Sequence, residues 1–287
     1  MDEAPQSSGY SAAAVGAVAD AVVACVRGRQ NAWRVGISGL QGSGKSTLAR
    51  QIQSMLEQRG VITARFSLDD FYLTHAERLR LAREVHPLLA TRGVPGTHDF
   101  EWLADTLDQL SSASAQWPVM IPRFDKNNDD RAEPNRWQTV TVPPQVILFD
   151  GWCVGVTAQT DAALVEPINA LERGEDGDGV WRSWVNAVLR EHYEPIWRSL
   201  DTLIVLQAPS FEVVERWRGE AERARRDKGD ARTMSDDELV RFIAHYERIS
   251  RWSLALVPTH ADCLLRLDSG RNVLAVETSK TPSESPQ

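Results

Sequence analysis

The chain has 287 residues, of which 42% are hydrophobic and 25% are charged, and its net charge is −8. These are ordinary values for a globular protein that is long enough to bury a sizeable core. The acidic balance argues against nucleic acid or an anionic membrane as a bulk partner, so any anion site must be a local concentration of positive groups.

The cysteines and the N-terminal sequence predict a cytoplasmic protein. The three cysteines are widely spaced and form neither a C-x-x-C pair nor a zinc-binding pattern, which is typical of a reducing compartment. The first residues lack the basic start of a signal peptide. The Ala- and Val-rich stretch at 11–26 is short for a membrane span and contains Asp20, so we predict a helix with one apolar face.

A phosphate-binding loop follows at residues 39–47, which read GLQGSGKST and match G-x-x-x-x-G-K-[ST]. The glycines let backbone N–H groups point at phosphate oxygens, Lys45 places a charge near the β- and γ-phosphates, and the Ser46 hydroxyl can bind Mg²⁺. An apolar run precedes the loop and a helical pattern follows it, as a P-loop requires. The predicted ATP-binding residues are Gly39, Gln41, Gly42, Ser43, Gly44, Lys45, Ser46 and Thr47.

The second predicted strand, residues 61–68, ends in Asp69-Asp70-Phe71-Tyr72. Carboxylates at the carboxyl end of a parallel strand lie where open α/β sheets bind their ligands. A helix-capping turn accounts for only one of the two aspartates, so we interpret the pair as part of the site.

Two loops in the middle of the chain keep both a structural and a binding interpretation. After a predicted helix at 74–90, the Gly- and Pro-containing loop at 92–99 can cap the next helix through Asp99 while His98 contacts a ligand. The charged loop at 123–131 is either solvated or contacts the substrate.

The third core strand is predicted at residues 146–152, and its first four residues are apolar and are followed by Asp150, which is the Walker B pattern. A carboxylate there can hold the Mg²⁺ shell through water or polarise an attacking group. The acidic stretch that follows at 172–179 is predicted to be a flexible loop without a catalytic role, and residues 180–198 to be a helix whose tryptophans pack in the core.

A helix at 212–227, after a strand at 202–206, carries five arginines. It is either an exposed helix with i,i+4 ion pairs or a lid whose arginines close over the transferring phosphate. A helix that begins with a capping box at Ser235 and a strand at 262–267 complete the pattern.

This alternation of strands and helices predicts an α/β fold with a doubly wound, mostly parallel sheet and helices on both of its faces. We expect one domain over 11–274, with a helical lid at about 212–234. Residues 1–10 are expected to be disordered, and the Ser/Pro/Glu-rich residues 275–287 to form a flexible tail.

Taken in order, these motifs resemble the D-glycerate 3-kinase family, the plant and fungal type of P-loop kinase within the uridine kinase and phosphoribulokinase group. The resemblance spans about residues 33–270 and rests on GLQGSGKST at 39–47, SLDDFYLT at 67–74, the loop at 92–99, PRFDK with DR at 122–131, DGW at 150–152 and the Arg-rich helix. It implies a P-loop NTPase fold with a five-stranded parallel sheet and a mobile lid. It also implies ATP- and Mg²⁺-dependent phosphorylation of a hydroxyl on a small acid, with D-glycerate giving 3-phosphoglycerate.

Carried over position by position, Asp69 matches the general base of the wider group and Arg226 matches the lid arginine. Asp150 takes the place usually held by Glu, and its shorter side chain leaves open whether it contacts Mg²⁺ directly. The loop after Lys126 is shorter than in the plant enzymes, so substrate choice is less determined than the fold.

These considerations define an expected active site. Lys45, Asp69 and the two lid arginines Arg218 and Arg226 would be catalytic, and Ser46 and Asp150 would hold the metal. Arg123, His98 and Lys126 are the first choices for contacts with the acid, because a guanidinium suits a carboxylate. The other expected substrate-binding residues are Asp70, Tyr72, Asp99 and Trp152.

Two other functions remain possible on the sequence. One is a related kinase that phosphorylates a nucleoside, a pantothenate-like acid or another polyol. The other is a regulatory protein that binds ATP without catalysis, although the paired aspartates and the Arg-rich helix argue against it.

Overall fold

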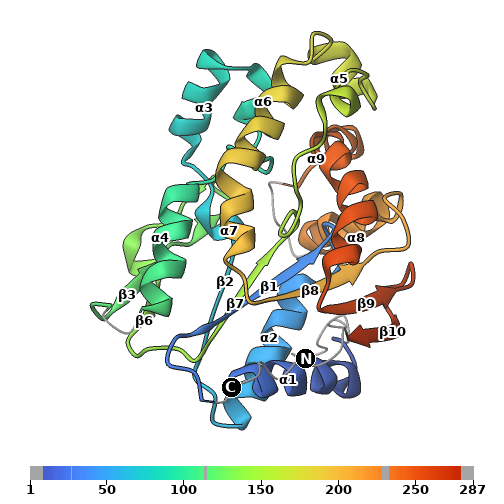
Figure 1. The fold of residues 1–287 in the computed structure, drawn as a ribbon. Coiled ribbons are helices and arrows are strands. Elements are labelled where there is room, and N and C mark those ends of the chain that lie inside the picture. The colour runs from blue at the N-terminus through green and yellow to red at the C-terminus, as the bar shows by residue number, and fades with distance from the viewer. Residues whose placement is uncertain (1–8, 27, 113–114, 228–232, 279–287) are drawn as a thin grey trace.

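The computed structural model describes residues 9–26, 28–112, 115–227 and 233–278, and the fold is built on one six-stranded sheet. The strand order is β10-β9-β8-β1-β7-β2 (Figure 1). The strands are β1 (Trp33–Gly39), β2 (Thr63–Ser67), β7 (Val146–Gly151), β8 (Thr202–Gln207), β9 (Cys263–Leu267) and β10 (Val273–Thr278). The first five run parallel, which confirms the predicted doubly wound α/β sheet.

The sixth strand, β10, pairs antiparallel with β9 and was missed in the sequence. Residues 275–278 were expected in a flexible tail, and that expectation is wrong for them. Strand β10 lies at the edge of the sheet and is half-exposed, so it lacks the apolar run that marks the buried strands. The rest of the expected tail, the first eight residues of the expected disordered N-terminus and residues 228–232 of the expected lid lie outside the described residues.

Helices cover both faces of this sheet and divide its core into two hydrophobic clusters. Helices α1 (Ala12–Val26) and α2 (Lys45–Gln58) pack on one face, toward the bottom of Figure 1. Helices α4 (Phe100–Ser111), α6 (Val180–Val188) and α7 (Glu194–Arg198) contribute to the cluster on the other face. Strand β7 is buried along its whole length because it has a neighbour on each side and a layer on each face.

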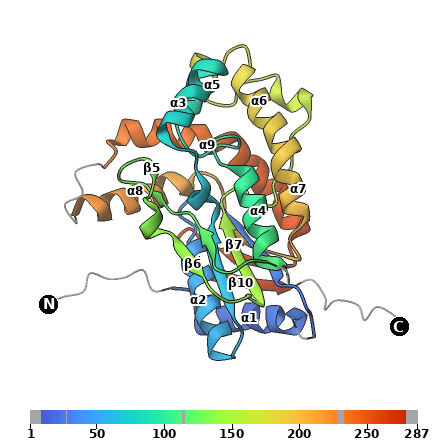
Figure 2. The same cartoon turned by 90° about the vertical axis from the view of Figure 1, so that its left-hand side faces the viewer.

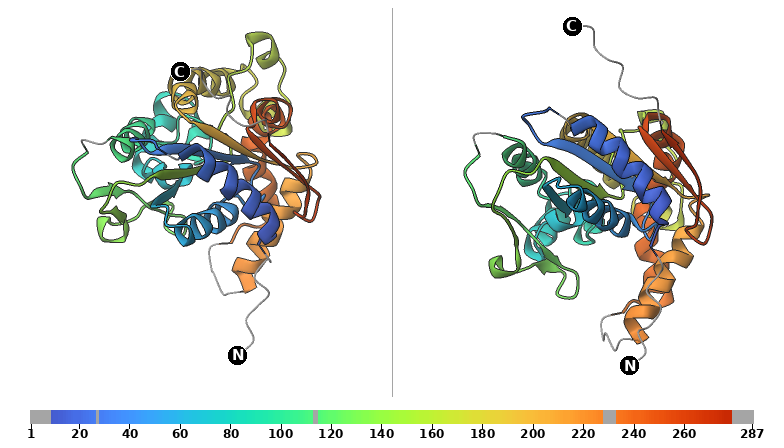
Figure 3. Two further views of the ribbon diagram at one scale, coloured as in Figure 1. Left: turned by 60° about the horizontal axis from the view of Figure 1, so that its bottom comes forward. Right: turned by 90° about the horizontal axis from the view of Figure 1, so that it is seen from below.

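Four further α-helices complete the described part of the fold. They are α3 (His75–Glu84), α5 (Ala170–Glu175), α8 (Val213–Asp227) and α9 (Asp236–Leu256). Helix α8 runs outward from the body of the molecule, as two further views show (Figures 2 and 3). Two small two-stranded sheets, β3 (Val119–Ile121) with β6 (Gln138–Val140) and β4 (Phe124–Asp125) with β5 (Asp130–Arg131), lie in the connection between α4 and β7.

The acidic stretch at 172–179 is not the flexible loop that the sequence predicted. Its first residues form α5, and Glu172 and Asp176 are fully buried. Glu172 pairs with Arg248 at 2.6 Å and Asp176 pairs with Arg182 at 2.9 Å. A buried carboxylate requires such a partner, and Arg248 is 76 residues away in the chain, so the local composition could not reveal it.

Two predicted helices are shorter or less regular than expected. Helix α3 ends at Glu84, and a separate 3₁₀ turn at Pro87–Ala90 follows, because proline suits a first turn but not a helix interior. The helix predicted at 180–198 contains a π-helical turn at Leu189–Tyr193 between α6 and α7. Trp181 and Trp197 of this region are buried in the core, as predicted.

No helix within the described ranges has both the length and the apolar character needed to cross a membrane.

Candidate active site

The loop between β1 and α2 has the conformation that its glycines allow. Gly42 and Gly44 have positive φ angles of 77° and 92°. A Cβ atom on Gly42 would lie 2.7 Å from Cβ of Trp217 in α8, and one on Gly44 would lie 2.8 Å from the Tyr10 hydroxyl oxygen. Both positions therefore require glycine for backbone conformation and for space.

The same loop is suited to hold phosphate. Helix α2 begins at Lys45, and no side chain caps its first turn, so its N-terminal N–H groups point toward the loop. Ser43 Oγ is buried and has no hydrogen-bond partner in the described part of the chain. An anion in the loop would satisfy these groups, and the residues present therefore fit a triphosphate.

Lys45 is half-buried, and its Nζ donates a hydrogen bond to the Leu40 carbonyl oxygen at 3.1 Å. Burial lowers the pKa of Lys45, while the nearby carboxylates of Asp150 and Asp69 oppose this shift. The ammonium group is thus already held among negative charges, and phosphate oxygens would add further stabilisation of its charged form.

Ser46 and Asp150 are brought together by the register of the sheet. Asp150 lies opposite Ile37 of β1 and Ser67 of β2, at the carboxyl end of β7. Ser46 Oγ donates to Asp150 Oδ2 at 2.9 Å. Burial raises the pKa of Asp150, and Lys45 and Ser46 counteract this rise.

This hydroxyl–carboxylate pair fits Mg²⁺ that arrives with a nucleotide. Mg²⁺ usually takes one or two protein ligands and completes its shell with phosphate oxygens and water. The described residues contain no group of three or more His, Cys, Asp or Glu side chains that could hold a metal by themselves. A metal at Ser46 and Asp150 would therefore be shared with the phosphates.

Asp69 lies in the 3₁₀ turn Leu68–Phe71, directly after β2. Its Oδ1 accepts a hydrogen bond from the Tyr72 hydroxyl at 2.9 Å, and its Oδ2 pairs with Lys126 Nζ at 2.5 Å. Burial favours the neutral carboxyl, but Lys126 and Tyr72 together hold the pKa of Asp69 well below its usual range. Asp69 is therefore an ionised carboxylate at neutral pH.

One cavity of about 500 Å³ joins these groups. Of the residues expected in the site, the following line it: Gln41, Gly42, Gly44, Lys45, Ser46, Thr47, Asp69, Tyr72, Lys126, Asp150, Trp152 and Arg218. The cavity extends from the P-loop past Asp69 to the loop that carries Lys126. The P-loop and the Asp69 carboxylate thus border the same space.

Four residues expected to bind the substrate do not line this cavity. Asp70 accepts a hydrogen bond from the Ser67 N–H at 2.9 Å and pairs with Arg123 at 2.5 Å, so the two residues brace the turn that carries Asp69. Burial raises the pKa of Asp70 to about 6, against the opposing effect of Arg123. Asp99 caps α4 by accepting from the Trp102 N–H at 3.1 Å.

His98, the fourth of these residues, lies behind Tyr72 and is 1% exposed. The two rings stack with centroids 4.6 Å apart, and His98 Nδ1 contacts the Tyr193 hydroxyl at 2.8 Å. Burial lowers the pKa of His98 to about 3, so the ring is neutral at physiological pH. It supports the cavity wall through Tyr72.

The two expected lid arginines of α8 differ in position. Arg218 lines the cavity, contacts Glu222 Oε1 at 3.3 Å and lies over the Phe242 ring at 5.4 Å. Arg226 is exposed, donates to the Met234 carbonyl oxygen at 3.1 Å and does not line the cavity. The structure therefore favours Arg218 over Arg226 for contact with a bound ligand.

Arg92 and Tyr246 are among the cavity residues that were missed as site residues in the sequence. Arg92 belongs to the loop at 92–99, where a guanidinium beside Gly and Pro was a usable signal. Tyr246 comes from the middle of α9, and no local pattern distinguishes it from a core aromatic.

Comparisons with known proteins place similar sequences among kinases. The phosphoribulokinase/uridine kinase family matches residues 34–168. The chain is 37% identical over 222 residues to the "Uncharacterized kinase mug58" of Schizosaccharomyces pombe, over 74% of this chain and 77% of that protein. It is 34% identical over 221 residues to the chloroplastic D-glycerate 3-kinase of Arabidopsis thaliana, over 74% of this chain but 45% of that longer protein.

Among solved structures, the D-glycerate 3-kinase from Cryptococcus neoformans shares the fold. The two structures have a TM-score of 0.74 at 23% sequence identity, over 94% of this chain and 100% of that chain. The similarity therefore shows that the two proteins share the overall α/β fold.

Proposed function

Because the chain belongs to the phosphoribulokinase/uridine kinase family, as an ATP- and Mg²⁺-dependent P-loop kinase of the glycerate-kinase-like type, we propose that it phosphorylates a hydroxyl of D-glycerate to give 3-phosphoglycerate. The observation that carries this proposal is the single cavity lined by both the P-loop and Asp69. The name of the Arabidopsis relative and that of the Cryptococcus structure support glycerate as the acceptor. Lys126 and Arg92 in the cavity wall suit an acidic substrate.

In the proposed mechanism, the P-loop N–H groups and Lys45 bind the β- and γ-phosphates, and Ser46 and Asp150 would hold the metal. ATP supplies the phosphoryl group, and a bound Mg²⁺ would offset negative charge on the phosphates. Asp69 orients the acceptor hydroxyl and accepts its proton, while Arg218 faces the charge that develops on the γ-phosphoryl group. Each of these residues lines the same cavity.

The low pKa of Asp69 makes it a weak base but an ionised one. Phosphoryl transfer passes through a loose transition state in which the acceptor needs little deprotonation before attack. The role that we assign to Asp69 therefore combines orientation of the hydroxyl with acceptance of its proton as the transfer proceeds, and Tyr72 and Lys126 keep the Asp69 oxygens in place.

An acceptor panel tests this proposal. ADP release is measured with D-glycerate, L-glycerate, glycerol, uridine and pantothenate, and the phosphorylated carbon of the product is identified by ³¹P NMR. We expect D-glycerate to give the highest kcat/KM and the phosphate to lie on carbon 3. A preference for uridine would contradict the assignment, and ATP hydrolysis that does not depend on any acceptor would favour a regulatory protein.

A further inference from the structure

We propose that Arg92 binds the carboxylate of the acid acceptor and that Asp129, anchored by Arg78, positions the Arg92 guanidinium for this contact. The inference rests on the proposed function, because it concerns the same cavity and an acidic acceptor. It transfers to Arg92 the carboxylate-binding role that the sequence suggested for Arg123.

Arg123 is already occupied by other side chains. Its guanidinium pairs with Asp70 and with Gln138 Oε1, and it does not line the cavity. Arg92 lines the cavity together with Asp69 and Lys126, and its side chain is 20% exposed. A ligand in the cavity can contact Arg92 without breaking the Arg123–Asp70 ion pair that braces the 3₁₀ turn at Leu68–Phe71.

The backbone of Arg92 is fixed against α9. Its carbonyl oxygen accepts a hydrogen bond from the Tyr246 hydroxyl at 2.8 Å. The next residue, Gly93, has a φ of 136°, and a Cβ atom there would lie 1.8 Å from the same hydroxyl oxygen. Contact this close is possible only with glycine, so the start of the Arg92 side chain has a defined position.

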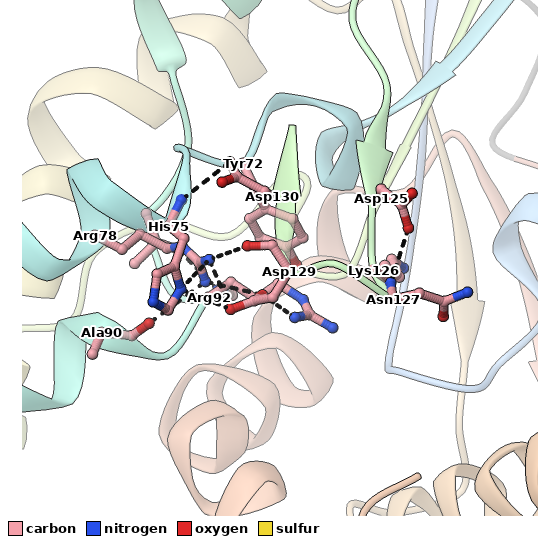
Figure 4. Close-up of polar contacts among 12 residues, drawn as sticks. Tyr72, His75, Arg78, Ala90, Arg92, Asp125, Lys126, Asn127, Asp129 and Asp130 are labelled. Carbon is pink, nitrogen blue, oxygen red and sulfur yellow. Dashed lines mark hydrogen bonds and ion pairs between the residues drawn. The ribbon is translucent and has the colours of Figure 1, made fainter. Parts of the chain in front are cut away.

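The end of the side chain is held by Asp129. One carboxylate oxygen of Asp129 accepts from Arg92 Nη1, and the other accepts from Arg78 Nη2 at 2.9 Å. Arg78 is completely buried and also donates to the main-chain oxygen of Asp129 at 2.7 Å. In Figure 4, Asp129 lies between His75 and Arg78 on one side and the Lys126–Asn127 end of its own loop on the other.

Asp129 adopts an uncommon backbone conformation to make these contacts. Its φ is +54°, in the left-handed region that non-glycine residues seldom occupy. Its side-chain and main-chain oxygens both bind Arg78, which stabilises this conformation. Burial opposes ionisation, but Arg78 and Arg92 together lower the pKa of Asp129, so its carboxylate is charged.

The charges of this cluster leave an excess of positive charge at the cavity. Two guanidinium groups share the single carboxylate of Asp129, and His75 Nδ1 also lies 3.2 Å from it. Arg78 makes the larger number of bonds to Asp129 and is buried, whereas Arg92 makes one side-chain hydrogen bond within the described residues. The nearby Lys126 is paired with Asp69.

An anion is therefore the ligand that suits Arg92, which lines the cavity. A planar carboxylate matches the fork of its guanidinium group. In this arrangement the acceptor hydroxyl lies at Asp69 and the carboxylate at Arg92. The two ends of a small hydroxy acid would thus be held by different elements, which orients the hydroxyl toward the P-loop.

Arg92→Gln tests the contact, with steady-state kinetics on D-glycerate and on glyceramide, its neutral amide. We expect the KM for D-glycerate to rise by about 30-fold or more, as when one partner of a hydrogen-bonded charge pair is removed. The KM for ATP should stay within about 2-fold, and the preference for the acid over the amide should shrink by about the same factor as the acid KM rises. Arg92→Lys should retain part of that preference, because it keeps the charge without the fork.

Arg136→Gln is the matched control, since Arg136 is an exposed arginine that pairs with Asp125 in the same connection and does not line the cavity. Arg136→Gln should leave the KM values for D-glycerate and ATP and the preference for the acid over the amide unchanged. Thermal unfolding of each variant shows whether it is folded.

A double-mutant cycle tests the positioning role of Asp129. Asparagine tolerates a positive φ, so Asp129→Asn keeps the backbone while it removes the charge. We expect a smaller rise in the KM for D-glycerate than Arg92→Gln causes, and little further rise when both substitutions are combined. A purely structural role would instead lower kcat and the melting temperature without changing the preference for acid over amide.

The outcomes separate the two proposals. If wild-type enzyme does not act on D-glycerate or another acid, the proposed function fails and the Arg92 assignment fails with it. If wild-type enzyme acts on D-glycerate but Arg92→Gln keeps the acid preference, only the Arg92 assignment fails. A rise in the KM for ATP rather than for the acid would place Arg92 at the nucleotide phosphates and would also overturn it.

Discussion

Among single residues, the two adjacent aspartates at this cavity show how neighbouring side chains set the pKa of a carboxyl group. Asp69 and Asp70 are adjacent in the chain, yet their pKa values are shifted in opposite directions. Asp69 accepts from Tyr72 and Lys126, which stabilise its charge. Asp70 is more deeply buried, and Arg123 only partly offsets that burial. The two carboxylates therefore serve different purposes, one facing the cavity and one bracing the turn.

Asp69→Asn and Lys45→Ala should each remove most of the turnover while the protein folds normally. Asparagine cannot accept the hydroxyl proton, and a general base of this kind contributes about 10²- to 10⁴-fold. Loss of the Lys45 ammonium removes a charge from the phosphate site. Single-turnover kinetics measure the chemical step, and circular dichroism checks the fold. Full activity of Asp69→Asn would remove Asp69 from the proposed role.

His98 predicts a pH dependence of stability. Its pKa is about 3 in the folded protein and near 6.5 in an unfolded chain, so the unfolded state binds the extra proton between these values. The contribution of neutral His98 to the free energy of unfolding is therefore complete above pH 6.5 and decreases as the pH falls toward 3. At pH 5 the loss attributable to this group is about 2 kcal/mol, from about 1.4 kcal/mol per pH unit.

Urea unfolding of wild type and His98→Gln at pH 7 and pH 5 measures this effect. The variant should lose less stability between the two pH values than wild type does. Equal losses in the two proteins would show that His98 is not the group that titrates.

At the scale of elements, the connection between α5 and α9 depends on a buried ion pair. Arg248 Nη2 lies 2.6 Å from Glu172 Oε2, and both side chains are less than a tenth exposed. The Arg248 guanidinium also donates to two carbonyl oxygens, those of Ala163 and Glu166. This one residue therefore ties three segments of the chain together beyond the carboxyl ends of the strands.

Glu172→Gln should destabilise the protein by about 3–5 kcal/mol, because it leaves a buried guanidinium without its counter-charge. Glu175→Gln is the matched control: Glu175 and Arg241 form an ion pair between the same two helices, but both side chains are exposed. That substitution should cost less than about 1 kcal/mol. Chemical denaturation measures the free energy of unfolding of both variants. Similar losses of stability would contradict the expectation that the buried ion pair contributes more than the exposed one.

At the scale of the whole molecule, the cavity draws on segments from all parts of the chain. The P-loop, the turn after β2, the loop after β4, the end of β7 and helices α8 and α9 each contribute to its wall. A ligand that binds this cavity therefore contacts the folded state alone, and its binding energy adds to the stability of the fold.

ATP with Mg²⁺ should therefore raise the melting temperature. At a nucleotide concentration of about 100 times Kd, the added stability is about 2.7 kcal/mol. Removal of Mg²⁺ with a chelator should reduce the shift, and Lys45→Ala should reduce it further. Differential scanning calorimetry measures each shift. An equal shift for wild type and Lys45→Ala would argue that the nucleotide binds elsewhere.

The P-loop, the five parallel strands and the carboxylates at their ends could be predicted from the amino-acid sequence. This was possible because these features are local: the P-loop is a run of consecutive residues, and a buried parallel strand is a continuous apolar run. Asp69 and Asp150 follow such runs directly, and all strands of a parallel sheet present their carboxyl ends at one edge. Each of these features could therefore be found from its own stretch of sequence, without knowing which segments pack beside it in the fold.

Which charged side chains line the cavity could not be predicted from the sequence, because it depends on contacts between distant segments. Arg92 and Arg123 look alike in the sequence, but Asp70 and Gln138 engage Arg123 while Asp129 leaves Arg92 at the cavity wall. The acidic stretch that contains Glu172 was likewise predicted to be a flexible loop, because its partner Arg248 is distant in the sequence. The reason is physical: an isolated charge stays in water, and it becomes buried or available only through partners that long-range packing supplies.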